Sequence, residues 1–375
     1  MKLICEKSQC TGCAACANRC PKHCISMVET SVLGHLYPQI DQKSCIDCGA
    51  CQKVCPALHP VEMHRPATAY AGWDKNNEEY VTSTSGGAAS AFSRWMISQG
   101  GVVYGCSMSG MEARHIRVDN VIDLYKLKGS KYVQSTIGDC YRQALSDLHQ
   151  GRKVLFIGTP CQVAALKSLV SRKDEQLLYT VDLICHGVPS LAQLKRHINK
   201  ITKGKIPDEI YFRKGSYLLL LLLLNGKEIY RSELFKQRYK DSYYNAFFDG
   251  FSYRESCYHC RYANSDRCSD ITIGDFWGLR GELPLAHPDG CSVLLPLTDK
   301  GNELLSGISD GFHLFERSVE EAVQGNDQLR HPKRKNWRIK LYRFLYPAFG
   351  DGWTFRLCVP DKILRMHLRK LIKGK

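Results

Sequence analysis

The sequence of 375 residues contains no hydrophobic run long enough to cross a membrane. Its longest apolar run, Leu218 to Leu224, has seven leucines, whereas a spanning helix needs roughly 20 apolar residues. We interpret this run as a buried strand and expect no transmembrane segment. The first residues also lack an apolar secretory segment, so the 19 cysteines are not expected to form a disulfide framework. A reducing cytoplasm is the expected location.

Acidic residues are scarce at the C-terminal end. Residues 330–375 contain 14 lysines and arginines but two acids, so this tail carries +12 of the net charge of +15. The rest of the chain is nearly neutral and shows no nucleic-acid-binding motif, so no nucleic-acid partner is expected. Positions 361–373 place Leu364, Leu368 and Leu371 on one helical face, which favours peripheral contact with an anionic membrane. The same pattern fits a helix packed on its own domain with a solvated basic side.

One cysteine pattern, C-x2-C-x2-C-x3-C-P, occurs twice within the first 56 residues. It is typical of ferredoxins with two 4Fe-4S clusters, in which the fourth cysteine of each run ligates the other cluster. A zinc ribbon needs only four ligands, so eight cysteines in two equal runs favour iron and sulfur. By this crossover rule the predicted ligands are Cys10, Cys13, Cys16 and Cys55 for the first cluster, and Cys20, Cys45, Cys48 and Cys51 for the second.

The pattern of strands and helices predicts an α+β or α/β protein. A small two-cluster ferredoxin domain, with short strands at 2–4 and 37–40, precedes a mixed, partly parallel sheet with helices and a less regular C-terminal part. The predicted divisions are a ferredoxin domain at 1–62, a domain with a ligand-binding loop at 67–150, a second domain with a further cluster at 151–329, and a basic aromatic tail at 330–375.

Two cysteines of the body follow consecutive predicted strands. Cys161 comes after strand 154–157 and Cys185 after strand 178–184, so adjacent parallel strands would bring both thiols to one edge of the sheet. Thr159 and Pro160 are good first residues of a helix, and a helix N-terminus favours a thiolate. A two-residue hook further along completes a predicted third 4Fe-4S cluster, whose ligands are Cys161, Cys185, Cys257 and Cys260. The hook alone could instead bind zinc, with His259 or Cys268, which we leave outside the cluster.

Two loops of the body are candidates for binding a phosphate or a flavin. The segment from Thr82 to Gly87 is rich in hydroxyls and glycine and precedes a predicted helix, whose free amides and dipole suit an anion. The segment from Gly129 to Ser135 presents one cation and three hydrogen-bonding groups. Such patterns are weak on their own, because a helix cap or a solvated turn has the same composition.

As an ordered set, these segments resemble the family of coenzyme F-420 hydrogenase/dehydrogenase beta subunits over residues 67 to 310. The matching segments are the two loops, 158–162, Cys185, the Cys257–Cys260 hook and 270–278. The resemblance implies a flavoprotein with FAD beside the third cluster. The residues that it assigns to FAD are Ser83, Ser85, Gly86, Gly87, Lys131, Gln134 and Ser135, with Thr159 and Asp275 lining the same cleft.

Iron–sulfur clusters move single electrons, and a flavin converts them into the pair that a substrate takes. We interpret the chain as an oxidoreductase that passes electrons from the ferredoxin clusters through the third cluster to FAD and an unidentified two-electron substrate. By motif, Lys131 would stabilise reduced flavin, while His186 and His259 are candidate proton donors or else tune the cluster by hydrogen bonding. The alternative is an electron-transfer subunit that reduces a protein partner. An electron donor or acceptor protein such as a ferredoxin is the expected partner.

Overall fold

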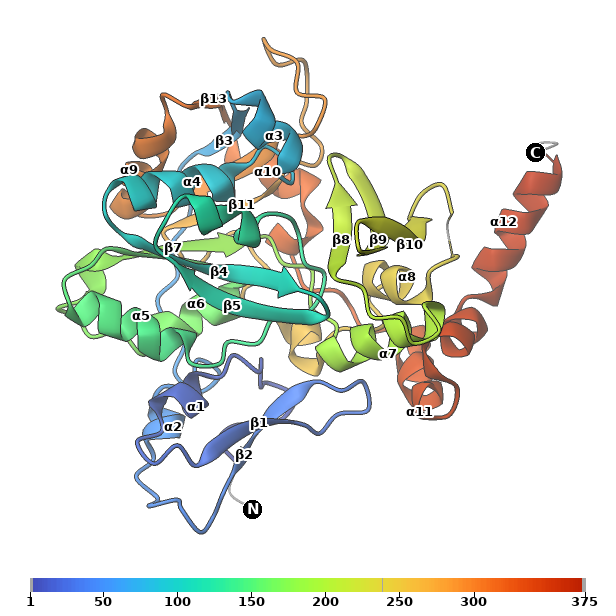
Figure 1. The fold of residues 1–375 in the computed structure, drawn as a ribbon, viewed down its shortest axis with the longest axis horizontal. Helices are drawn as coiled ribbons and strands as arrows, with labels where there is room; N and C mark the ends of the chain where they lie inside the picture. The colour runs from blue at the N-terminus through green and yellow to red at the C-terminus, as the bar shows by residue number, and fades with distance from the viewer. Residues whose placement is uncertain (1–2, 238, 373–375) are drawn as a thin grey trace.

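The computed structural model describes residues 3–237 and 239–372 (Figure 1). At one end lies the ferredoxin unit, with the antiparallel hairpin of β1 (Ile25–Glu29) and β2 (Leu36–Ile40) and the short helices α1 (Ala15–Arg19) and α2 (Ala50–Lys53). The predicted strand at 37–40 is β2. The strand expected at 2–4 is wrong at Leu3 and Ile4, and Lys2 lies outside the described residues. β2 pairs with β1 instead, because closing a short local hairpin costs less entropy than closing a long loop.

The body is built around one eight-stranded sheet with the order β13-β3-β12-β11-β7-β6-β4-β5. The four neighbours β11, β7, β6 and β4 run parallel, and the remaining pairings are antiparallel. This confirms the predicted mixed, partly parallel sheet. Its strands come from both sides of residue 150, so the two predicted domains of the body share it. The strands are β3 (Ala69–Asp74), β4 (Val102–Ser109), β5 (Glu112–Val118), β6 (Val154–Gly158), β7 (Leu178–Leu183), β11 (Ile271–Asp275), β12 (Ser292–Pro296) and β13 (Phe312–Arg317).

Helices cover both faces of this sheet (Figure 1). In β4, Val102 and Tyr104 pack with α5 (Cys140–His149) and α6 (Pro160–Lys167), whereas Val103 packs on the other side with α4 (Ala88–Ser98) and α9 (Asp299–Ile308). Burial on both faces explains why the central strands read as continuous apolar runs. The ferredoxin unit lies against the α5 and α6 side, where Ala14 and Ala15 join the same core.

A second sheet is antiparallel, with the order β10-β9-β8. The leucine run forms β9 (Tyr217–Leu224), as expected, between β8 (Glu209–Lys214) and β10 (Lys227–Glu233). Leu218 to Leu222 are buried, partly against α7 (Leu191–Ile201) and α8 (Ser242–Phe248). The other helical segments of the described body are α3 (Asn77–Thr82), α10 (Val319–Gly325) and the 3-10 turns Ile122–Leu127, Glu175–Leu177, Glu255–His259 and Asp327–Leu329.

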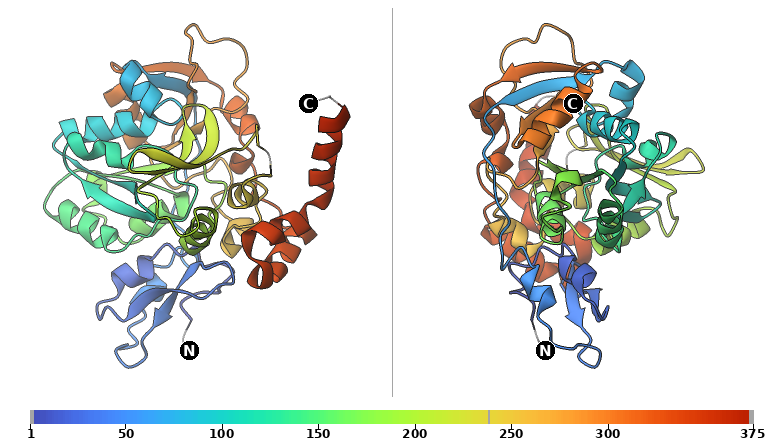
Figure 2. Two further views of the ribbon diagram at one scale, coloured as in Figure 1. Left: turned by 45° about the vertical axis from the view of Figure 1, so that its right-hand side comes forward. Right: turned by 90° about the vertical axis from the view of Figure 1, so that its left-hand side faces the viewer.

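The tail forms α11 (Trp337–Cys358) and α12 (Pro360–Ile372). Gly350 breaks α11 with a φ of 63°, and the buried faces on either side of this kink pack on the body through residues such as Tyr342 and Phe355. α12 extends away from the body in every view (Figure 2). Within residues 3–237 and 239–372, no helix is both long and apolar enough to span a bilayer.

Candidate functional site

The eight cysteines of the ferredoxin unit form two groups. Burial raises the pKa of Cys16, and the neighbouring thiols of Cys13, Cys10 and Cys55 raise it further. In the other group, burial and then Cys48 and Cys20 raise the pKa of Cys51. Cys55 therefore lies with the first run and Cys20 with the second, which is the grouping that the crossover rule predicts.

The two cysteine loops share one backbone conformation. Left-handed residues occur at Gly12 and Ala14 in the first run, and at the matching Asp47 and Gly49 in the second, with φ between 57° and 69°. This conformation is rare outside glycine, and it turns each loop tightly enough for three thiols to converge. The repeated spacing in the sequence thus corresponds to a repeated structure.

Each group has a further thiol that the spacing motif did not indicate. Cys5 forms hydrogen bonds with Cys10 and Cys55, and these raise its pKa. Cys24 lies beside the second group, with its Sγ 3.3 Å from the Sγ of Cys20. Both thiols stand outside the C-x2-C-x2-C-x3-C run, so no spacing signal could have identified them.

The four cysteines predicted for a third cluster also converge. β6 and β7 are adjacent and parallel, with Gly158 opposite Asp182, so Cys161 and Cys185 follow the same edge of the sheet. Burial raises the pKa of Cys185 to about 12, and Cys161 and then Cys260 contribute. For Cys257, burial, Cys185, Cys260 and Cys161 all raise the pKa. In the described part of the chain, no three His, Cys, Asp or Glu side chains are arranged to hold a single metal ion.

Cys268 is fully buried behind this group. Its thiol donates to the carbonyl of Pro160 at 3.5 Å. The neighbouring Arg267 forms a buried ion pair with Asp182, Nη2 to Oδ1 at 3.1 Å, and also donates to the carbonyl of Leu183. This pair holds the end of β7 against the segment that follows the hook.

A cavity of about 480 Å³ opens beside the third group, and this volume is typical of small-molecule sites. Cys161 and Cys185 form part of its wall, together with both predicted ligand loops. The predicted residues that line it are Ser83, Ser85, Gly87, Lys131, Gln134, Ser135, Thr159, His186 and Asp275.

Two predicted residues do not line this cavity. Gly86 is packed between strands, where a Cβ would lie 2.0 Å from the carbonyl oxygen of Gly72, so its lack of a side chain serves packing. His259 is exposed at the end of a 3-10 turn. A proton donor must come within hydrogen-bond reach of the reacting group, which this position does not provide.

Two other predicted flavin contacts already have protein partners. The side chain of Gln134 donates to the carbonyl of Thr11 at 3.0 Å. Ser135 accepts from the amide of Gln162 at 2.9 Å, so its own proton points to Nδ1 of His115, 3.0 Å away. His115 then carries its proton on Nε2, which is 3.1 Å from the carbonyl of Ile157, and burial lowers its pKa to about 4. Sequence reasoning missed His115 and Gln162, since neither stands in a recognisable motif.

The remaining wall is suited to an anionic cofactor. Gly87 begins α4 without a side-chain cap, so the first amides of this helix are free at the cavity. Burial lowers the pKa of Lys131 to about 8; its ammonium donates to two carbonyls and has no carboxylate partner among the described residues. Arg213 pairs with Asp275 at 2.6 Å, while its buried Nε has no hydrogen-bond partner in the described structure. An FAD diphosphate and ring edge fit these donors.

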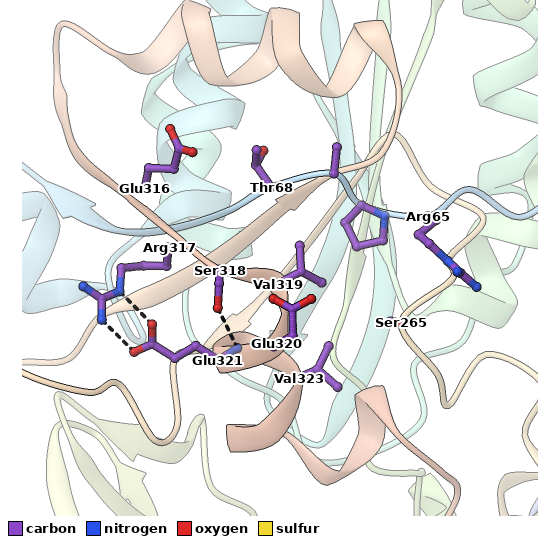
Figure 3. Close-up of a pocket in the computed structure, with 12 residues that line it drawn as sticks. Arg65, Thr68, Ser265, Glu316, Arg317, Ser318, Val319, Glu320, Glu321 and Val323 are labelled. Atoms are coloured by element: carbon purple, nitrogen blue, oxygen red, sulfur yellow. Dashed lines mark hydrogen bonds and ion pairs between the residues drawn. The ribbon is translucent and has the colours of Figure 1, made fainter.

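A larger surface opening of about 960 Å³ lies elsewhere (Figure 3). It is formed by residues 65–68, Ser265, the end of β13 and α10, with an ion pair between Arg317 and Glu321 at 2.9 Å. None of its lining residues is a cysteine or belongs to the ligand loops. The redox chemistry is therefore assigned to the smaller cavity.

Comparison with known families identifies both parts of the chain. Residues 151–321 match the C terminus of the beta subunit in coenzyme F420 hydrogenase/dehydrogenase. Residues 9–58 match the 4Fe-4S dicluster domain. The chain carries the C-terminal domain of this family of beta subunits behind a dicluster ferredoxin domain. This confirms the resemblance drawn from the motifs, and it makes the chain an iron–sulfur electron-transfer protein related to oxidoreductases.

Individual relatives are distant but extensive. One subunit of the F(420)H(2) dehydrogenase of Methanosarcina mazei is 19% identical over 84% of this chain and 86% of its own length. The coenzyme F420-dependent sulfite reductase of Methanocaldococcus jannaschii is 24% identical over 91% of this chain, which spans only 51% of that enzyme. A chain of the F420-reducing [NiFe] hydrogenase complex from Methanosarcina barkeri has the same fold, with a TM-score of 0.50 and 18% identity over 80% of this chain and 93% of its own.

Proposed function

We propose that the chain is an iron–sulfur flavoprotein oxidoreductase, which passes electrons from two ferredoxin-type clusters through a third cluster to FAD and a two-electron substrate. One observation carries the proposal. The thiol of Cys13, in the first group, is close enough to Cys161 to raise its own pKa, after the larger effect of burial and the Cys10 charge. Cys161 in turn lines the cavity. The two cluster groups and the cavity are therefore contiguous.

The residues of the cavity have separate roles in this proposal. FAD, when bound, supplies the conversion between single electrons and an electron pair. The free amides of α4, with Ser83 and Ser85, hold its phosphates, while Lys131 places a positive charge beside the ring. His186 lines the same wall and is kept neutral because burial lowers its pKa. It is the better placed of the two predicted proton donors.

Iron and flavin content is the first test. We expect anaerobically purified, full-length protein to contain about 12 irons in three cubanes and one FAD per chain. Inductively coupled plasma analysis and the visible spectrum of the released flavin measure both. Iron-replete protein without flavin would contradict the proposal and favour an electron-transfer subunit that reduces a protein partner.

A protein partner is expected to dock at the second cysteine group. Cys48 is exposed, and the adjacent Ile46 is 57% exposed, so this cluster lies where an electron carrier such as a ferredoxin reaches it. Two of the relatives are named as a subunit or as part of a complex, which supports a partner for this chain as well. We assign the entry of electrons to this end.

We also propose peripheral contact between the tail and an anionic membrane. Ion pairs attach the first turn of α12 to the protein, with Arg338 to Asp361 at 2.9 Å and Lys362 to Asp249 at 3.0 Å. Beyond them Leu364 is 60% exposed, and Leu368 is also exposed, which leaves an apolar face without a protein neighbour. The side chains of Arg369, Lys370 and Leu371, which complete the predicted pattern, lie outside the described residues.

Vesicle sedimentation tests this contact. Replacing Leu364 and Leu368 with serine is expected to abolish binding to vesicles with anionic lipid, because the buried apolar area is lost. Serine at Ile122, which is 85% exposed on the body, is the matched control and should leave binding unchanged. Equal sedimentation of the double variant and the parent protein, or binding that ignores lipid charge, would refute the proposal.

A further inference from the structure

Arg254 is completely buried at the boundary between the ferredoxin unit and the body, with 0% of its surface exposed. Its guanidinium donates from Nε to the carbonyl of Cys10 at 2.7 Å and from Nη2 to the carbonyl of Leu36 at 2.6 Å. Nη1 donates to the side-chain oxygen of Gln134 at 3.2 Å. The group also stacks 4.1 Å from the centre of the Tyr37 ring. One side chain thus connects two units of the protein.

All of these acceptors are neutral. Within the described structure no carboxylate lies at ion-pair distance from Arg254, whereas the other two buried arginines, Arg213 and Arg267, face Asp275 and Asp182. A guanidinium cannot release its proton inside a protein, and an unpaired buried charge carries a large desolvation penalty. Arg254 therefore requires a negative partner that is not a carboxylate.

The side chains around Arg254 indicate that partner. Nη2 lies 3.8 Å from the Sγ of Cys10, and a hydrogen bond from Cys5 followed by the Arg254 charge lowers the pKa of this thiol to about 6. Arg254 also acts against the burial that raises the pKa of Cys161. The chain leaves room for the guanidinium at Gly12, where a Cβ would lie 2.6 Å from Nη1. The cation therefore stands between the first and third thiol groups.

We propose that Arg254 is the fixed counter-charge of the first 4Fe-4S cluster and raises its reduction potential. The inference rests on the proposed function, since it requires that cluster. A cubane with four thiolates is an anion and becomes more negative when it accepts an electron, so a nearby fixed cation favours the reduced form. No described arginine side chain contacts a thiol of the second group. Electrons entering there are thus drawn inward to the first cluster.

Redox titration of the full-length, iron-loaded protein, followed by electron paramagnetic resonance, tests this role. Arg254→Met is expected to lower the reduction equilibrium constant of one cluster about tenfold, which is about 59 mV for a one-electron step. Arg254→Lys keeps the charge and should keep most of the potential. Arg142→Met is the matched control, because Arg142 bridges the same two units through the carbonyls of Ala17 and Asn18 but is paired with Asp139. It should leave every potential unchanged.

A second variant covers loss of folding in the first. Gly12→Ala retains the charge but displaces the guanidinium, so a smaller decrease of the same cluster's potential is expected. If Arg254→Met and Gly12→Ala both leave every reduction equilibrium constant within a factor of two, Arg254 only docks the two units and the inference is wrong. A parent protein that lacks the first cluster would instead refute the proposed function.

Discussion

Replacing Cys185 with alanine is expected to decrease the iron content from about 12 to about 8 atoms per chain, because a cubane that loses one of four thiolates is not retained. Cys185 follows β7 at the edge of the sheet, and its thiol lies near those of Cys161 and Cys260. It also lines the cavity. Losing this cluster removes the connection between the ferredoxin unit and the bound flavin, so reduction of the flavin through the first two clusters should stop.

Anaerobic iron analysis and rapid-mixing spectroscopy measure the two effects together. Cys268→Ala is the decisive control, since Cys268 is buried close to the same group but donates its thiol to the carbonyl of Pro160. It should keep all three clusters. An unchanged iron content in the Cys185 variant, with iron loss in the Cys268 variant, would mean that Cys268 is the true fourth ligand.

The second large effect is expected on stability. Arg267 and Asp182 form an ion pair in which the two side chains are 1% and 0% exposed. Replacing Arg267 with alanine leaves the carboxylate of Asp182 buried without its cation, and such changes decrease the free energy of unfolding by about 3–5 kcal/mol. The variant also loses the hydrogen bond to the carbonyl of Leu183, two residues before Cys185. We therefore expect the third cluster to become labile as well.

Denaturant unfolding of iron-loaded protein, followed by tryptophan fluorescence and by cluster absorbance, measures this loss. Arg65→Ala is the matched control in the neighbouring segment, where Arg65 pairs with Asp266 but is 79% exposed. Exposed pairs contribute about 0–1 kcal/mol, so this variant should unfold close to the parent protein. Similar midpoints for the two variants would show that the buried pair does not hold β7 in place.

Much of the fold was predictable because it depends on local patterns. The alternation of apolar strands and helices between residues 69 and 184 predicted the parallel part of the sheet, and the leucine run predicted β9. The partner of β2 was not predictable in the same way. Pairing is decided by the whole hairpin and its packing, and the short segment at 2–4 carries too few residues to compete with β1.

The candidate site was predictable to a different extent at each residue. Lys131 and Ser83 line the cavity, as the family motifs imply. Gly86 belongs to the same motif, but it serves strand packing, and Gln134 supports Arg254. A motif records that a residue type is required in a segment, and it does not distinguish contact with a ligand from support of the loop that makes the contact.

The amino-acid sequence alone determined the iron–sulfur chemistry, because the spacing within each cysteine run is a local property that sets which thiols share one loop. It also determined the membership of the body in its family through ordered motifs. Only the tertiary structure decided that Cys13 meets Cys161 and that an unpaired Arg254 lies against Cys10. Those contacts join residues far apart in the chain, and they exist because the ferredoxin unit packs on α5 and α6, which no local spacing encodes.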